Sequence, residues 1–109
     1  MSKFSFWVKV TEEDIARYRD GEISCPVEVA MKRAAMLTFR THKIRVRNGF
    51  LQVWTTNNAN NFSWWNSWYP TPRGRKLAET CRAYRVLSPQ LKRFKMEDVS
   101  PTMFLLSES

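Results

Sequence analysis

Alternating apolar and polar positions open the chain. From Phe4 to Val10 the apolar side chains recur at every second residue, which is the spacing of a half-buried β-strand. Thr11 follows as a candidate N-cap, and the three acidic residues after it suit the first turn of a helix. The pattern therefore predicts a first strand and then a short helix that ends near Asp20-Gly21.

Proline marks the start of each later helix. Cys25-Pro26 is a helix start because proline is favoured in the first helical turn, and apolar residues at helical spacing continue to about Leu37. Thr71-Pro72 predicts another helix by the same reasoning, with Thr71 as its cap. The segment from Ser88 to Phe94 predicts a short basic helical turn.

The clearest local pattern is a β-hairpin between Lys43 and Trp54. Two alternating runs flank Asn48-Gly49, a pair that favours a two-residue type I′ turn. With that turn, Arg47 lies opposite Phe50, and the remaining pairs follow in register. The expected core face consists of Ile44, Val46, Leu51 and Val53, and the expected outer face consists of Lys43, Arg45, Arg47, Phe50, Gln52 and Trp54.

The segment 55–72 lacks a clear periodicity. It contains no charge, is rich in Asn and then holds a dense aromatic cluster, so we expect a long loop with at most a short strand from Phe62 to Trp65. Near the end of the chain, Met103 to Leu106 predicts a closing strand.

These elements predict an α+β fold. A chain of 109 residues with 43% hydrophobic residues has the size and composition of one packed domain, here residues 1–109. We expect an antiparallel sheet with a central Asn-Gly hairpin, packed on one face by two to three helices, among them those starting at Cys25-Pro26 and Thr71-Pro72. Cys25 and Cys81 lie far apart in sequence and form no paired ligand or redox spacing, so buried reduced thiols are expected.

Charge narrows the choice of partner. Lysine and arginine number 18 against 10 acidic residues, a formal net charge of +8. Residues 32–95 hold 14 basic residues against one acid, which gives +13, whereas residues 1–31 and 96–109 carry −2 and −3. A field of this sign attracts polyanions or acidic protein surfaces, although it can also serve solubility alone.

The outer face of the hairpin is the first candidate site. Cations and rings alternate there, so the face can hold phosphates and stack bases. The alternative is that the rings form ordinary cross-strand cation-π contacts or lie under another element. The residues expected to bind are Arg40, Lys43, Arg45, Arg47, Phe50 and Trp54.

Two further groups are candidates. Trp64, Trp65 and Trp68 can act as stacking platforms or interface anchors, or they can belong to the core and hold a long loop in place. Arg73, Arg75 and Lys76 lie at the start of the helix from Pro72, where backbone N–H groups favour an anion; a solvated basic face explains them equally well.

Catalysis has little support in this sequence. The only histidine, His42, stands between basic residues, no glycine-rich phosphate loop is present, and the acids Glu12, Glu13 and Asp14 are explained by capping. We therefore expect a protein that is not an enzyme and has no cofactor or metal. The first apolar stretch is too short for a membrane span or a signal peptide, so a cytoplasmic location is expected.

Parts of the chain resemble small accessory proteins of tailed bacteriophages. The segments in question are Lys9 to Thr11 with its acidic helix, Cys25 to Ala34, Thr71-Pro72 and Val99 to Phe104. The aromatic, Asn-rich segment and Lys92 to Lys95 depart from that pattern. The resemblance implies a phage product acting in the host cytoplasm, and it adds an alternative to nucleic acid as partner: an acidic host protein such as a polymerase or a metabolic enzyme.

Overall fold

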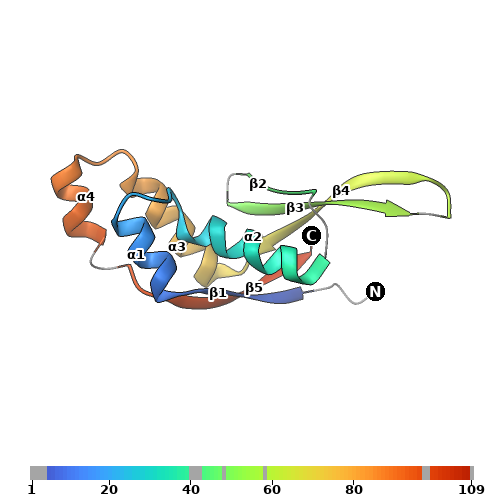
Figure 1. Cartoon of the computed structure of the whole chain (residues 1–109), viewed down its shortest axis with the longest axis horizontal. Coiled ribbons are helices and arrows are strands. Elements are labelled where there is room, and N and C mark those ends of the chain that lie inside the picture. The colour runs from blue at the N-terminus through green and yellow to red at the C-terminus, as the bar shows by residue number, and fades with distance from the viewer. Residues whose placement is uncertain (1–4, 40–42, 48, 58, 97–98, 109) are drawn as a thin grey trace.

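The computed structural model describes residues 5–39, 43–47, 49–57, 59–96 and 99–108, with the backbone alone at 57, 89, 93, 94 and 96. Within these residues, five strands form one antiparallel sheet in the order β1-β5-β4-β3-β2 (Figure 1). The elements are β1 (Ser5–Val10), α1 (Glu12–Arg19), α2 (Pro26–Phe39), β2 (Ile44–Arg47), β3 (Phe50–Asn57), β4 (Phe62–Pro70), α3 (Pro72–Tyr84), α4 (Pro89–Met96) and β5 (Thr102–Glu108).

The α+β class and the antiparallel sheet are confirmed. The two ends of the chain pair with each other: β1 forms one edge of the sheet, and β5 lies between β1 and β4. The expected central position of the Asn-Gly hairpin is wrong, because β2 is an edge strand and the hairpin lies at one side of the sheet. No described helix is long and apolar enough to cross a membrane.

The register of the β2–β3 hairpin is as predicted. Arg47 pairs with Phe50, and the ladder continues to the pair Ile44 and Val53. Gly49 has φ +85°, the left-handed conformation that the second position of a type I′ turn requires; Asn48 lies outside the described residues. Alternation then directs Ile44, Leu51 and Val53 into the core.

The helix starts follow local capping, with one difference from expectation. Thr11 forms a capping box with Asp14, since each side chain accepts a hydrogen bond from the other residue's backbone N–H. Thr71 precedes α3 as predicted, but its hydroxyl makes no cap bond. It instead donates to the Leu105 carbonyl at 3.0 Å and accepts from the Leu105 N–H at 3.2 Å, which ties the start of α3 to β5.

The core lies between the sheet and the helices. Alternate residues of β1 and β5, among them Val8 and Phe104, pack against the buried residues of α2 and α3. Cys25 and Cys81 are both buried in this core, as predicted. The sequence did not reveal that their thiols lie within hydrogen-bonding reach; this contact lowers the pKa of Cys25, and the same contact together with burial raises the pKa of Cys81.

The expected loop over residues 55–72 is wrong for most of its length. β3 continues to Asn57 and β4 runs from Phe62 to Pro70, so the segment forms a second long hairpin. Asn61, with φ 54°, supplies a left-handed residue in the connection. The aromatic cluster therefore stands on a strand with two defined faces.

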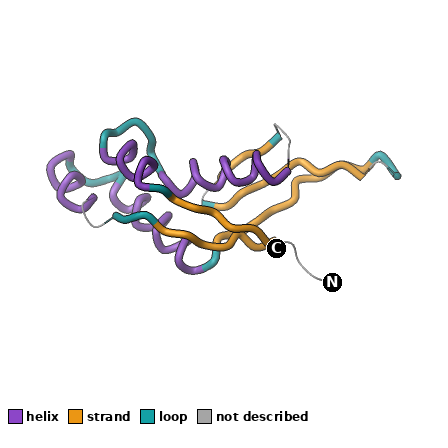
Figure 2. The backbone as a smooth tube through the Cα atoms, turned by 60° about the horizontal axis from the view of Figure 1, so that its bottom comes forward, coloured by secondary structure: helices purple, strands orange, loops and turns teal. Residues whose placement is uncertain are grey.

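This second hairpin extends beyond the helices as an arm. The molecule measures 54 × 23 × 21 Å, and its Cα radius of gyration is 15.3 Å, against about 13 Å expected for a compact chain of this length. The helices gather at one end, and the β3–β4 arm projects from the other (Figure 2). Part of this arm thus has no helix packed on it.

Candidate nucleic-acid interface

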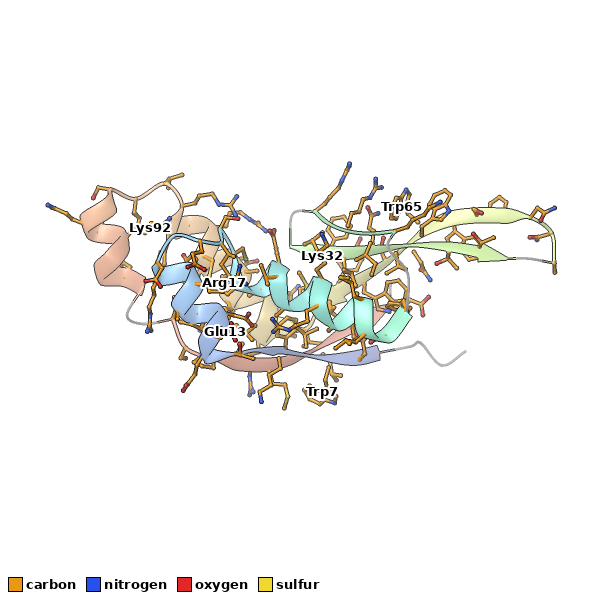
Figure 3. The ribbon with its side chains drawn as sticks, in the orientation of Figure 1. Trp7, Glu13, Arg17, Lys32, Trp65 and Lys92 are labelled. Carbon is orange, nitrogen blue, oxygen red and sulfur yellow. The ribbon has the colours of Figure 1, made fainter. Side chains whose placement is uncertain are left out.

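Strands β2, β3 and β4 together form an outer face that points away from α2. Strand pairing places one residue from each strand side by side in three successive rows. Trp65 marks this face in Figure 3, on the side of the arm away from the helix. The rows are Arg47–Phe50–Tyr69, Arg45–Gln52–Ser67 and Lys43–Trp54–Trp65, and we call these nine residues the outer face.

Aromatic pairs occupy both ends of the outer face. Phe50 and Tyr69 stack with ring centroids 5.0 Å apart and an interplanar angle of 21°. Trp54 and Trp65 meet edge to face, with centroids 5.2 Å apart. Phe50 and Trp54 are four residue steps apart along β3, which corresponds to about 13 Å at the rise of a β-strand. The outer face therefore offers two ring platforms with a polar row between them.

A chain of hydrogen bonds holds Arg45 in the middle row. Its Nε donates to Gln52 Oε1 at 2.7 Å, and Gln52 Nε2 donates to Ser67 Oγ at 3.3 Å. The guanidinium lies over the Trp65 ring, 3.8 Å from its centroid. Desolvation and the charge of Arg47 lower the pKa of Arg45, although an arginine stays protonated at neutral pH.

The charge of this face has one sign. Lys43, Arg45 and Arg47 line the β2 edge, and Lys43 Nζ lies 5.8 Å from the centroid of the Trp54 ring. None of the nine residues is acidic. Three cations along one edge repel each other, and a bound polyanion would relieve that repulsion.

The structure brings most of the predicted hairpin-face residues together and adds others. Ser67 and Tyr69 join the outer face because β4 pairs with β3, which the expected loop would not have allowed. Arg75 lies next to the Phe50–Tyr69 pair, on the side of α3. Arg82, which is not among the predicted binding residues, lines the same space.

Other predicted residues lie elsewhere. Trp68 is 3% exposed and packs on Phe39 with ring centroids 4.9 Å apart, so it belongs to the core and we remove it from the interface. Trp64 lies on the opposite face of the arm from Trp65. Arg73 and Lys76 line a separate pocket with Val99 and Ser100. Arg40 lies outside the described residues.

A pocket of about 160 Å³ continues the outer face towards α3. Its wall on the sheet side is formed by Phe50 and Tyr69, and its wall on the helix side by Arg75, Glu79 and Arg82. The pocket therefore combines rings, cations and one carboxylate in a single concavity.

The described side chains offer anion binding and stacking. Within the described ranges, no three His, Cys, Asp or Glu side chains gather where they could hold a metal ion. No known family model matches the sequence, and no curated protein or solved structure matches it either. The chemistry of the outer face is therefore the main indication of function.

Proposed function

We propose that this protein binds nucleic acid through the outer face. The observation that carries the proposal is the arrangement around Trp65, where Trp54 packs edge to face and Arg45 stacks above the ring. Bases stack on aromatic side chains and also on arginine guanidinium planes, while Lys and Arg neutralise phosphates. The protein acts as a binding protein without catalysis or cofactor.

The ligand is single-stranded over the part that contacts this face. Ring platforms can receive a base only when that base is unstacked, and a paired helix keeps its bases stacked inside. Trp54 and Trp65 are half-buried and Tyr69 is exposed, so their ring surface is accessible from the outer side. Gln52 and Ser67 provide hydrogen-bonding groups between the two platforms.

The two cation-π contacts have a structural explanation as well. Arg45 above Trp65 and Lys43 beside Trp54 stabilise a hairpin without any ligand. Such contacts do not require three cations on one edge with no acid among the nine outer-face residues. Lys43 and Arg45 already lie against the Trp54 and Trp65 rings, so each pair can contact a base and its phosphate together.

Charge reversal on the β2 edge tests the proposal. Arg45→Glu/Arg47→Glu should lower affinity for a single-stranded oligonucleotide by about 100-fold or more at low salt, with a shallower dependence on salt. Fluorescence anisotropy across a salt series measures both quantities. The matched control is Arg85→Glu/Lys95→Glu, which makes the same charge change at two exposed positions, the C-cap of α3 and a residue of α4. Equal affinity losses in the two folded variants would contradict a specific role for the outer face.

An acidic host protein is the second candidate partner, as expected of a phage-type accessory product. The observation that favours it lies on the opposite face of the arm, where Phe62 is 61% exposed and its ring centroid is 5.6 Å from that of Trp64. Exposed aromatic pairs are frequent anchors at protein interfaces. This candidate predicts a stoichiometric partner whose binding depends on Phe62 and Trp64 and persists when Arg45 and Arg47 are reversed.

A further inference from the structure

The pocket beside the turn between β2 and β3 adjoins one end of the outer face. Phe50 and Tyr69 belong both to the end of the outer face and to the pocket wall. Tyr69 is 46% exposed, so part of its ring remains open to a ligand. A nucleic-acid strand bound along the outer face can therefore enter this pocket without leaving the protein surface.

Helix α3 presents three charged residues to this space. Arg75, Glu79 and Arg82 recur at helical spacing, which brings them to one face of the helix. A Cβ added at Gly49 would lie 2.9 Å from an Arg82 guanidinium nitrogen, so Arg82 reaches the hairpin turn. None of the three forms an ion pair with another described residue. Their charges thus remain available to a ligand.

We propose that this pocket holds one nucleotide of the bound strand, an inference that rests on the proposed nucleic-acid binding. The base stacks on Tyr69, and Arg75 and Arg82 bind the adjoining phosphate. A guanidinium suits this role because its planar donors match phosphate oxygens in pairs. One nucleotide of the bound nucleic acid is thereby held next to the Phe50–Tyr69 ring pair.

Glu79 gives the pocket a preference among bases. A carboxylate accepts hydrogen bonds and donates none at neutral pH, so it pairs with the exocyclic amino group of cytosine, adenine or guanine. Thymine and uracil lack that amino group, and their one base donor, the ring N3–H, lies between two carbonyl oxygens that repel a carboxylate. With two guanidinium groups against one carboxylate, the pocket still attracts a phosphate. The pocket is therefore selective for a nucleotide whose base carries an amino group.

Two pairs of substitutions on the same helix test the phosphate contact. Arg75→Ala/Arg82→Ala should lower affinity for a labelled single-stranded oligo(dC) by about tenfold. The control Arg73→Ala/Lys76→Ala removes the same charge from the other side of α3, where these residues line a different pocket, and should cost at most about threefold. If the first double variant unfolds, Arg75→Ala against Arg73→Ala makes the same comparison. Equal losses in the two sets overturn the inference.

Glu79→Met tests the base contact independently of attraction by net charge. If Glu79 acts only through its charge, its removal strengthens binding to every oligonucleotide equally. If Glu79 contacts the base, the preference of the unchanged protein for oligo(dC) over oligo(dT) disappears in the variant. A preference that survives the substitution, or its absence in the unchanged protein, overturns the inference. If Arg45→Glu/Arg47→Glu loses binding while the Arg75, Arg82 and Glu79 variants keep their affinity and base preference, the proposed function stands and only the nucleotide pocket is rejected. Absence of oligonucleotide binding by the unchanged protein removes both.

Discussion

The Arg45 guanidinium lies 3.8 Å from the centroid of the Trp65 ring, although β3 separates the two strands that carry them. The side chain of Arg45 extends across β3, where Gln52, its neighbour on that strand, accepts a hydrogen bond from its Nε. The contact joins the charged edge of the sheet to the aromatic arm. It therefore places a cation and an aromatic ring side by side on the outer face, the combination on which the proposed binding depends.

Trp65→Leu separates stacking from charge. The substitution leaves net charge unchanged and removes a ring platform, so affinity for single-stranded oligonucleotides should fall about 5- to 100-fold. The dependence of affinity on salt should stay as it was, because Arg45 keeps its charge and its hydrogen bond to Gln52. Anisotropy titrations at several salt concentrations measure both effects.

The neighbouring tryptophan provides the control for this prediction. Trp64 has the same chemistry and the next position in β4, but it faces the opposite side of the arm. Trp64→Leu should leave affinity unchanged within about twofold if the outer face alone binds nucleic acid. A loss in Trp64→Leu as large as that in Trp65→Leu would mean that both faces of the arm bind the ligand.

Much of the hairpin could be predicted because its signals are local. Asn48-Gly49 favours one turn type, and strict alternation on both sides fixes which residues face the core. The register of β2 and β3 follows from these two facts, and so does the position of Arg45 and Arg47 on the outer face. Capping by Thr11 is similarly local and was also predictable.

Most of strand β4 escaped prediction, beyond the short strand expected from Phe62 to Trp65, because its two faces have similar chemistry. Trp64 and Trp65 point to opposite sides of the arm, and neither side is fully buried, so no alternation of apolar and polar residues marks the strand. Pairing with β3 is what places Trp65 on the outer face and Trp68 in the core. The pocket was unpredictable for a related reason, since the approach of α3 to Gly49 depends on tertiary packing.

The ion pair between Asp14 and Arg33 should make stability fall at acidic pH. Asp14 is 2% exposed, and Arg33 donates to both of its carboxylate oxygens, at 2.9 and 2.7 Å. The hydrogen bond from Arg33 holds the pKa of Asp14 below its ordinary value of 3.8. A lowered pKa means that the stabilisation is present above about pH 4 and is lost as pH falls through the folded-state pKa.

Asp14→Asn isolates this contribution. The variant should lose about 2 kcal/mol of unfolding free energy at pH 7, because the ionic contact and part of the capping box are gone. Urea unfolding followed by tryptophan fluorescence should show a difference from the unchanged protein that is constant from pH 7 to about pH 4 and shrinks as the pH falls further. Glu13→Gln, at an exposed position of the same helical turn, is the control and should cost little. A difference that stays constant below about pH 4 as well would contradict the role of the ionised carboxylate.

Gly74 allows α3 to approach β5 closely enough to place Arg75 beside the outer face. A Cβ at this position would overlap the Phe104 ring, which is 2% exposed and packed in the core. Alanine is favoured over glycine by about 1 kcal/mol in a helix, yet Gly74→Ala should lower the free energy of unfolding by about 1 to 3 kcal/mol because the core becomes overpacked. Thermal or urea unfolding measures this change. Combining it with Phe104→Leu should cost less than the sum of the two single variants, since the smaller side chain relieves the overlap. A stabilised Gly74→Ala would show that helix propensity outweighs packing at this contact.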